Sequence, residues 1–138
     1  MERDDWLLVA IGEDMIEPVQ VQKTMFMFAQ ETEVPEAESY EFVPYNWGPC
    51  SFEIYTDLDD LIERGMVQRF PTGLGWSSYG LTDEGKARAE GLREVADESH
   101  LQELGEWRDW VTTKSFRSLL NAVYEKHPDY AISSVFTD

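Results

Sequence analysis

The spacing of apolar residues predicts that most of this chain is helical. Several apolar runs recur at intervals of three and four residues, which places each run on one face of a helix. They are Val21, Met25 and Phe28 within residues 18–30; Ile54, Leu58, Leu61 and Ile62 within residues 52–64; Leu101, Leu104, Trp107 and Val111; and Phe116, Leu119, Leu120, Val123 and Tyr124. A shorter helix over residues 6–11 precedes them, capped by Asp4 or Asp5 and stopped by Gly12.

Two stretches between these helices favour strands and turns. Residues 40–45 alternate aromatic and polar side chains, which predicts a short edge strand ended by Pro44, and residues 46–49 read as a turn before Ser51 caps the next helix. Residues 67–70 and 78–81 then predict a hairpin around a connection with two glycines. Thr82 is placed to cap the helix that follows, over residues 86–96.

Particular residues accompany this order. Leu61-x3-Gly65-Met66-Val67 is followed by Tyr79-x-Leu81-Thr82-x2-Gly85. Before them come Gln22-Lys23-x2-Phe26-x-Phe28 and Tyr45-Asn46-x-Gly48-Pro49-x-Ser51, and the tail reads Val123-Tyr124-x2-His127-Pro128-x-Tyr130-Ala131-x-Ser133. Together these motifs resemble the prokaryotic winged helix-turn-helix family, and most closely its YwgA-like and SocA-antitoxin-like groups. The resemblance touches most of residues 19–134.

The expected fold is therefore mainly α with a small β wing. It has a winged helix-turn-helix core over residues 1–96 and a C-terminal helical extension over residues 97–138 that packs on the core, so that both form a single compact unit. By the resemblance, the third helix and the wing would contact the partner. The contact positions would be Ser51, Glu53, Thr56, Asp57 and Asp60 on the helix, and Thr72 to Trp76 at the wing tip, with Arg64 and Arg69 as the nearby cations.

Charge changes what that surface is expected to bind. The 138 residues hold 28 Asp and Glu against 11 Lys and Arg, for a formal net charge of −17. From Phe52 to Met66 there are five carboxylates and one cation, Arg64. Because DNA binding depends on Lys and Arg that neutralise phosphates, this composition opposes a DNA-reading role. Only four of the 11 basic residues are lysines, which suits either an ordinary acidic cytosolic protein or one adapted to a salt-rich cytoplasm.

Few residues suggest chemistry. The single cysteine, Cys50, lies next to a helix start but has no base placed beside it, so a small buried thiol is the simpler interpretation. His100 and His127 lack partners at metal-ligand spacing, and Gly73-x-Gly75 lacks the rest of a phosphate loop. We therefore expect no enzyme, no cofactor and no metal. The short apolar run near the N-terminus matches neither a signal peptide nor a membrane span, so a cytoplasmic protein without membrane contact is expected.

Three hypotheses for function remain open at this point. The first is a regulatory module that binds a protein partner or a second copy, with Tyr45, Trp47 and Trp76 either forming an aromatic patch for that partner or filling the core. The second is a DNA-binding transcriptional regulator, dimeric and salt-adapted. The third is an acidic, antitoxin-like inhibitor that imitates DNA. The acidic third helix favours the first.

Overall fold

The computed structural model describes residues 1–136 and is mainly helical, with two small antiparallel sheets of two strands each. The helices are α1 (Arg3–Ile11), α2 (Pro18–Glu31), α3 (Phe52–Glu63), α4 (Asp83–Val95), α5 (Glu98–Thr112) and α6 (Phe116–Lys126), with short 3-10 turns η1 (Glu36–Glu38) and η2 (Pro128–Ala131). The strands are β1 (Val43–Tyr45), β2 (Gly48–Cys50), β3 (Val67–Pro71) and β4 (Ser77–Leu81). The predicted mixture of helices with a small β component is confirmed.

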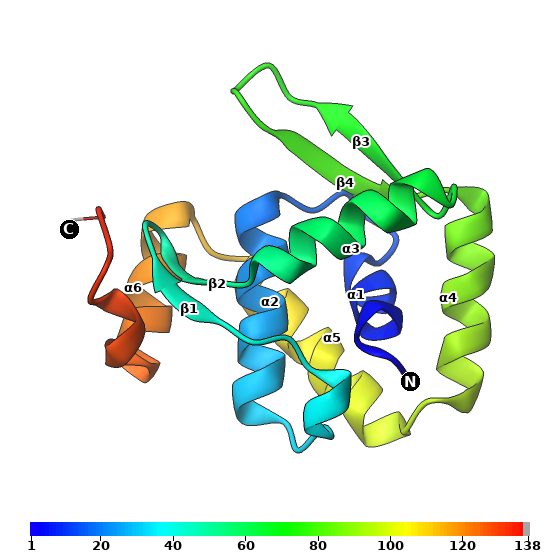
Figure 1. The fold of residues 1–138 in the computed structure, drawn as a ribbon, viewed down its shortest axis with the longest axis horizontal. Helices are drawn as coiled ribbons and strands as arrows, with labels where there is room; N and C mark the ends of the chain where they lie inside the picture. The colour runs from blue at the N-terminus through cyan, green and yellow to red at the C-terminus, as the bar shows by residue number, and fades with distance from the viewer. Residues whose placement is uncertain (137–138) are drawn as a thin grey trace.

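Helix α1 runs through the middle of the first of two buried apolar clusters. Every residue from Trp6 to Ile11 is at most 6% exposed, because α2, α3, α4 and α5 surround this helix (Figure 1). The cluster also takes Leu58 from α3 and Leu104 from α5. Burial on all sides explains why α1 shows no polar face in the sequence.

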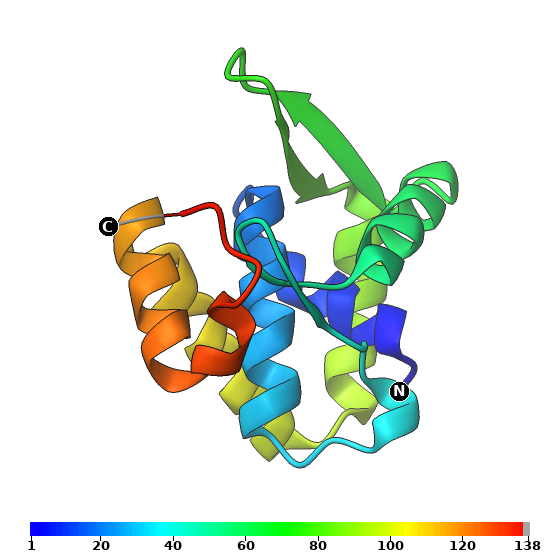
Figure 2. The same ribbon diagram turned by 60° about the vertical axis from the view of Figure 1, so that its left-hand side comes forward.

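A second apolar cluster joins α2 to the two last helices. Phe26 and Met27 of α2 pack with Val111 of α5 and with Leu119 and Val123 of α6, all at most 1% exposed. Since α2 contributes to both clusters, the C-terminal helices share a core with the rest of the molecule. Figure 2 shows α6 and the C-terminal segment lying beside α2.

The β3–β4 hairpin projects away from the helical body (Figures 1 and 2). Its register pairs Val67 with Leu81 and Pro71 with Ser77, which matches the predicted hairpin within one residue at each end. The base is anchored by Ile16, whose backbone N–H and carbonyl exchange hydrogen bonds of 2.9 and 2.8 Å with Tyr79. The tip therefore stands free while the base is held to the core.

The turn into α4 follows the predicted capping pattern. Thr82 Oγ1 accepts a hydrogen bond from the Gly85 backbone N–H at 3.0 Å and donates to the Gly65 carbonyl oxygen at 2.5 Å. Gly85 is required here by close approach, because a Cβ at this position would lie 2.0 Å from the Met66 carbonyl oxygen. One hydroxyl thus joins the end of the α3 turn to the start of α4.

Two local predictions are wrong. Helix α1 starts at Arg3 with Glu2 at the N-cap, and Asp5 accepts from the Glu2 backbone N–H at 2.9 Å, so neither Asp4 nor Asp5 is the cap residue. Residues 40–42 are not in a strand; Val43–Tyr45 pairs with Gly48–Cys50, and Pro44 lies inside β1, opposite Pro49. Each strand of a two-stranded sheet is an edge strand, and proline is tolerated on an edge strand where its nitrogen faces away from the partner strand.

Candidate functional site

A cavity of about 570 Å³ opens between segments that are distant in sequence. Its walls come from the start of α2, the β1–β2 hairpin, the first turn of α3, the tip of the β3–β4 hairpin and the start of α6. The lining residues are Glu17, Pro18, Val19, Gln22, Lys23, Tyr45, Trp47, Gly48, Cys50, Phe52, Tyr55, Trp76 and Phe116. The volume lies in the range of small-molecule sites.

Aromatic side chains make up much of this lining, and we call these residues the aromatic cavity. The three aromatics weighed as a patch from sequence, Tyr45, Trp47 and Trp76, are all partly exposed, at 44–46%. They are joined by Phe52, Tyr55 and Phe116, which sequence analysis did not connect with them. The rings of Tyr45 and Phe52 meet edge to face at 5.1 Å between centroids, and those of Trp47 and Phe116 at 5.6 Å.

Lys23 is the single cation among the residues that line the cavity. It lies in the second turn of α2 and is 2% exposed, although lysine is almost never buried without a partner. Its Nζ donates to the Pro49 carbonyl oxygen at 3.1 Å, and among the described residues no carboxylate lies within 4 Å of it. Burial lowers the pKa of Lys23 to about 8. In the sequence, Lys23 is the single charged residue between Pro18 and Gln30, which is the feature that sets it apart.

The side chain of Gln22, which lines the cavity, is hydrogen-bonded to the backbone of Ser51. The Gln22 side chain accepts from the Ser51 backbone N–H at 2.8 Å and donates to the Ser51 carbonyl oxygen at 2.9 Å. Ser51 lies at the N-cap position of α3, as predicted, but its hydroxyl makes no cap hydrogen bond. At 1% exposed, Ser51 is not on the surface, so it does not lie at the expected partner contact. Gln22 has replaced the hydroxyl as the group that fixes the entry to α3.

Cys50 is also buried in this wall, at 7% exposed. Burial raises the pKa of its thiol, and the nearby Lys23 ammonium opposes that rise. Since the thiolate is the nucleophilic form, a raised pKa favours the unreactive thiol.

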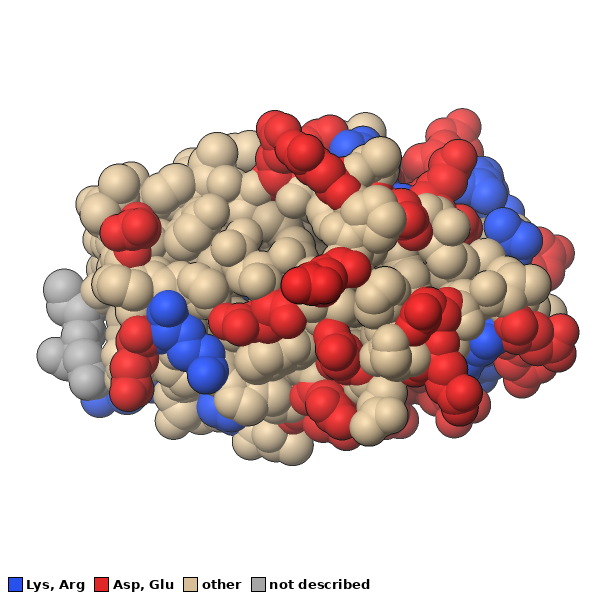
Figure 3. All heavy atoms as spheres, turned by 90° about the horizontal axis from the view of Figure 1, so that it is seen from below, with Lys and Arg blue, Asp and Glu red and all other residues tan. Residues whose placement is uncertain are grey.

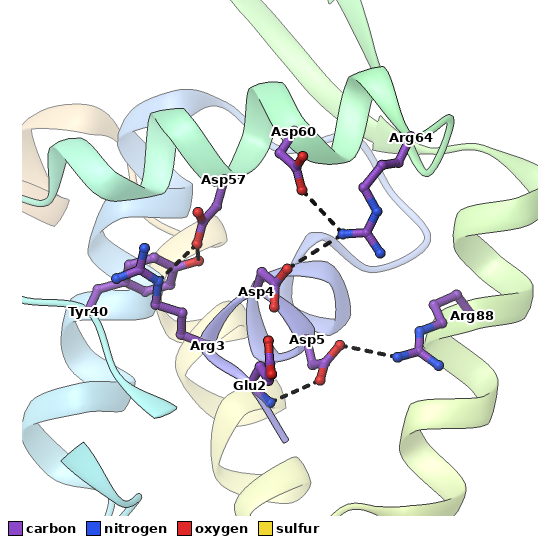
Figure 4. Close-up of polar contacts among 9 residues, drawn as sticks. All are labelled: Glu2, Arg3, Asp4, Asp5, Tyr40, Asp57, Asp60, Arg64 and Arg88. Atoms are coloured by element: carbon purple, nitrogen blue, oxygen red, sulfur yellow. Dashed lines mark hydrogen bonds and ion pairs between the residues drawn. The ribbon is translucent and has the colours of Figure 1, made fainter. Parts of the chain in front are cut away.

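The acidic residues of α3 divide into two groups, and the first faces α1 (Figure 4). Asp57 accepts from the Tyr40 hydroxyl at 2.6 Å and from Arg3 Nε at 3.1 Å, and its side chain is only 17% exposed. Arg3 also pairs with Glu53. Asp57, expected at the partner surface, is therefore committed to an internal network, and Glu53 is tied to the same arginine.

Both cations of the expected contact surface are paired as well. Arg64 lies 3.3 Å from Asp60 and 3.6 Å from Asp4, so it links α3 to α1 (Figure 4). Arg69, on β3, pairs with Asp59 of α3. Burial, and then the neighbouring Asp5 carboxylate, raise the pKa of Asp4. Each of these two arginines therefore already has a carboxylate partner within this chain.

The outward side of α3 carries what remains of the expected contact surface. Thr56, Asp59, Asp60 and Glu63 are exposed there, and the Asp60 carboxylate turns back to Arg64 on the side that faces α1 (Figure 4). At the hairpin tip, Thr72 Oγ1 donates to the Trp76 carbonyl oxygen at 2.7 Å and accepts from the Leu74 N–H at 3.2 Å, which orders the connection. Figure 3 shows a different face, the one seen from below and turned away from the hairpin, where carboxylate side chains are spread over the surface and basic side chains are fewer.

The histidines lie at helix junctions. His127 Nε2 is 3.0 Å from a Glu31 carboxylate oxygen, and its ring packs edge to face on Phe26 at 5.0 Å. His100 packs beside Trp6. Within residues 1–136, no group of three or more His, Cys, Asp or Glu is arranged to hold a metal ion, and no helix is both long and apolar enough to cross a membrane.

No protein-family model matches the chain, and no curated protein matches it. The function must therefore be argued from the geometry and charge of the described residues.

Proposed function

We propose that this chain is a non-enzymatic regulatory module with winged helix-turn-helix architecture that acts through a protein partner. Apart from the η1 turn and the β1–β2 hairpin inserted between α2 and α3, the order of three helices, a hairpin and a fourth helix supports the architecture, with α3 and the β3–β4 hairpin as its contact elements. The contact surface consists of Thr56, Asp59, Asp60 and Glu63 on the outer side of α3 together with the hairpin tip at residues 72–76. We call this set the outer α3 surface.

One observation carries the choice of protein over DNA. Arg64 and Arg69 are the cations of α3 and the hairpin, and each is held by carboxylates of this chain. Phosphate contacts supply most of the affinity of DNA readers and need cations that the phosphates can neutralise. The outer α3 surface instead presents the Glu63 carboxylate and the Thr56 hydroxyl beside the ion-paired Asp59 and Asp60. Its net charge remains negative, which complements a basic protein surface.

DNA binding by the purified protein tests this proposal. Fluorescence anisotropy with a labelled duplex of about 20 bp at about 50 mM salt should show no binding at micromolar protein, because low salt exaggerates electrostatic repulsion as well as attraction. The double variant Asp59→Lys, Glu63→Lys is the matched control. It adds two cations at exposed positions and removes the partner of Arg69, so it should gain salt-sensitive binding.

Micromolar binding of duplex DNA by the unmodified protein at that salt would overturn the proposal in favour of a DNA-binding regulator. A steep loss of that binding between about 50 and 200 mM salt would identify it as phosphate-driven.

A further inference from the structure

The aromatic cavity carries an inference that does not rest on the proposed function, although the cavity shares Trp76 with the outer α3 surface. We propose that it binds a small organic monocarboxylate with a flat apolar body, and that the Lys23 ammonium holds the carboxylate. The ligand class follows from three features of the cavity: a buried cation, aromatic walls, and a nearly neutral lining.

The buried cation supplies the anchor. An ammonium has three N–H donors, and among the described residues Lys23 Nζ uses one of them, on Pro49. Burying a charge without a counter-ion is costly, so a carboxylate arriving in the cavity would both pair the charge and satisfy a donor. At 2% exposed, Lys23 has little contact with water that could compensate for the cost of burying its charge.

The aromatic walls select the body of the ligand. Trp47, Phe52, Trp76 and Phe116 are large apolar side chains that stay 44–54% exposed around the opening. A flat apolar ligand would remove these exposed aromatic side chains from water. Burying that apolar surface lowers the free energy of the complex. Because Trp76 belongs to the β3–β4 hairpin and Phe52 to α3, a bound ligand would contact both elements at once.

The remaining charges limit the anion to a single negative charge. Glu17 is the one carboxylate that lines the cavity, and the chain as a whole carries a net charge of −17. A single lysine can balance one ligand carboxylate, whereas phosphate or a dicarboxylate would bring a second negative charge with no cation to receive it. The cavity volume of about 570 Å³ suits a small molecule.

Paired acid and amide probes test the inference. Naphthalene-2-acetate, its neutral amide and inorganic phosphate are titrated by calorimetry and by amide NMR of the full chain at pH 7. The acid should bind at least about tenfold more tightly than the amide, because charged hydrogen bonds contribute more than neutral ones. Phosphate should not bind, and acid-dependent shifts should map to residues 17–23, 45–55, 72–76 and to the region of Phe116.

Three variants make the result specific. Lys23→Met should bring the acid to the affinity of the amide, while Lys86→Met, which removes an exposed lysine of α4, should leave it unchanged. Trp76→Ala should weaken acid and amide alike, and its exposed position keeps it informative if Lys23→Met does not fold. Equal affinity for acid and amide, no binding at millimolar acid, or full binding by folded Lys23→Met would each overturn the inference. These outcomes leave the DNA test of the proposed function untouched.

Discussion

At the residue scale, Asp57 and Lys23 are two charged side chains largely removed from water that differ in their hydrogen-bond partners. Asp57 receives two donors, the Tyr40 hydroxyl and Arg3, so its partial burial is compensated by hydrogen bonds and an opposite charge. Lys23 receives one carbonyl and no described carboxylate. The first arrangement stabilises the junction of α1 with α3, whereas the second leaves a desolvated charge at the edge of a cavity.

The cost of burying Lys23 should appear as a pH-dependent stability. Its pKa is about 8 in the folded protein against 10.5 for an unperturbed lysine, so the unfolded chain binds more protons between these values and stability rises with pH in that window. The rise attributable to Lys23 is about 3 kcal/mol.

Urea unfolding at several pH values measures this rise. Cys50→Ala and Cys50→Ala, Lys23→Met are compared, because removing the thiol removes the ionisable neighbour of Lys23. The other ionisable groups that line the cavity are the same in both proteins. The stability of the first relative to the second should increase from about pH 8 to about pH 10.5. A flat difference across that window would show that Lys23 is not desolvated.

At the element scale, the two glycines of α4 have different reasons to be there. A Cβ at Gly85 would meet the Met66 carbonyl oxygen, so this glycine sets how closely the first turn of α4 approaches the end of the α3 turn. No atom lies within 4 Å of a Cβ at Gly91, in the third turn of the same helix. The same residue type is thus a packing requirement at one position and a loss of helix propensity at the other.

Alanine at each glycine separates these reasons. Gly85→Ala should destabilise the protein by at least about 3 kcal/mol, because rigid backbone must move to admit the methyl group. Gly91→Ala should stabilise it by about 0.5–1 kcal/mol through helix propensity. Thermal and urea unfolding measure both. Equal effects at the two positions would contradict the close approach of Gly85 to Met66.

Local patterns predicted the elements well and their mutual contacts poorly. Periodicity and capping residues located α2, α3, the β3–β4 hairpin and the Thr82 cap, because those signals act within a few residues. The β1–β2 pairing was missed because Gly48-Pro49 reads as a turn. The role of Ser51 was missed because its backbone partner, Gln22, lies 29 residues earlier.

The candidate site was predictable only in part for the same reason. Tyr45, Trp47 and Trp76 could be singled out as aromatics near turns, but Phe116 reaches the cavity from a helix about 40 residues beyond Trp76. The sequence could not place Lys23 in the aromatic cavity, since the spacing of apolar residues does not show which side of α2 other elements leave uncovered. The ion pairs that withdraw Asp57 and Arg64 from the expected surface also depend on α1 lying across α3.

At the scale of the whole molecule, the net negative charge and the proposed architecture favour different classes of partner. The proposed winged-helix architecture favours nucleic acid as the partner, whereas 28 acidic residues against 11 basic ones oppose it. The pairing of Arg64 and Arg69 within the chain decides between them in our proposal. In that proposal, the hairpin tip and the outer side of α3 form the protein-binding surface.

Site-specific photo-crosslinking tests this central claim most directly. A benzophenone side chain replaces Thr56 on the outer α3 surface or, as a control, Glu90 on the exposed side of α4, and cells of the source organism are irradiated and lysed with or without nuclease. We predict one protein adduct of defined mass from position 56, unaffected by nuclease, absent from position 90, and reduced when Asp59 and Glu63 are changed to lysine. An adduct with nucleic acid, or a protein adduct that nuclease abolishes, would contradict the account.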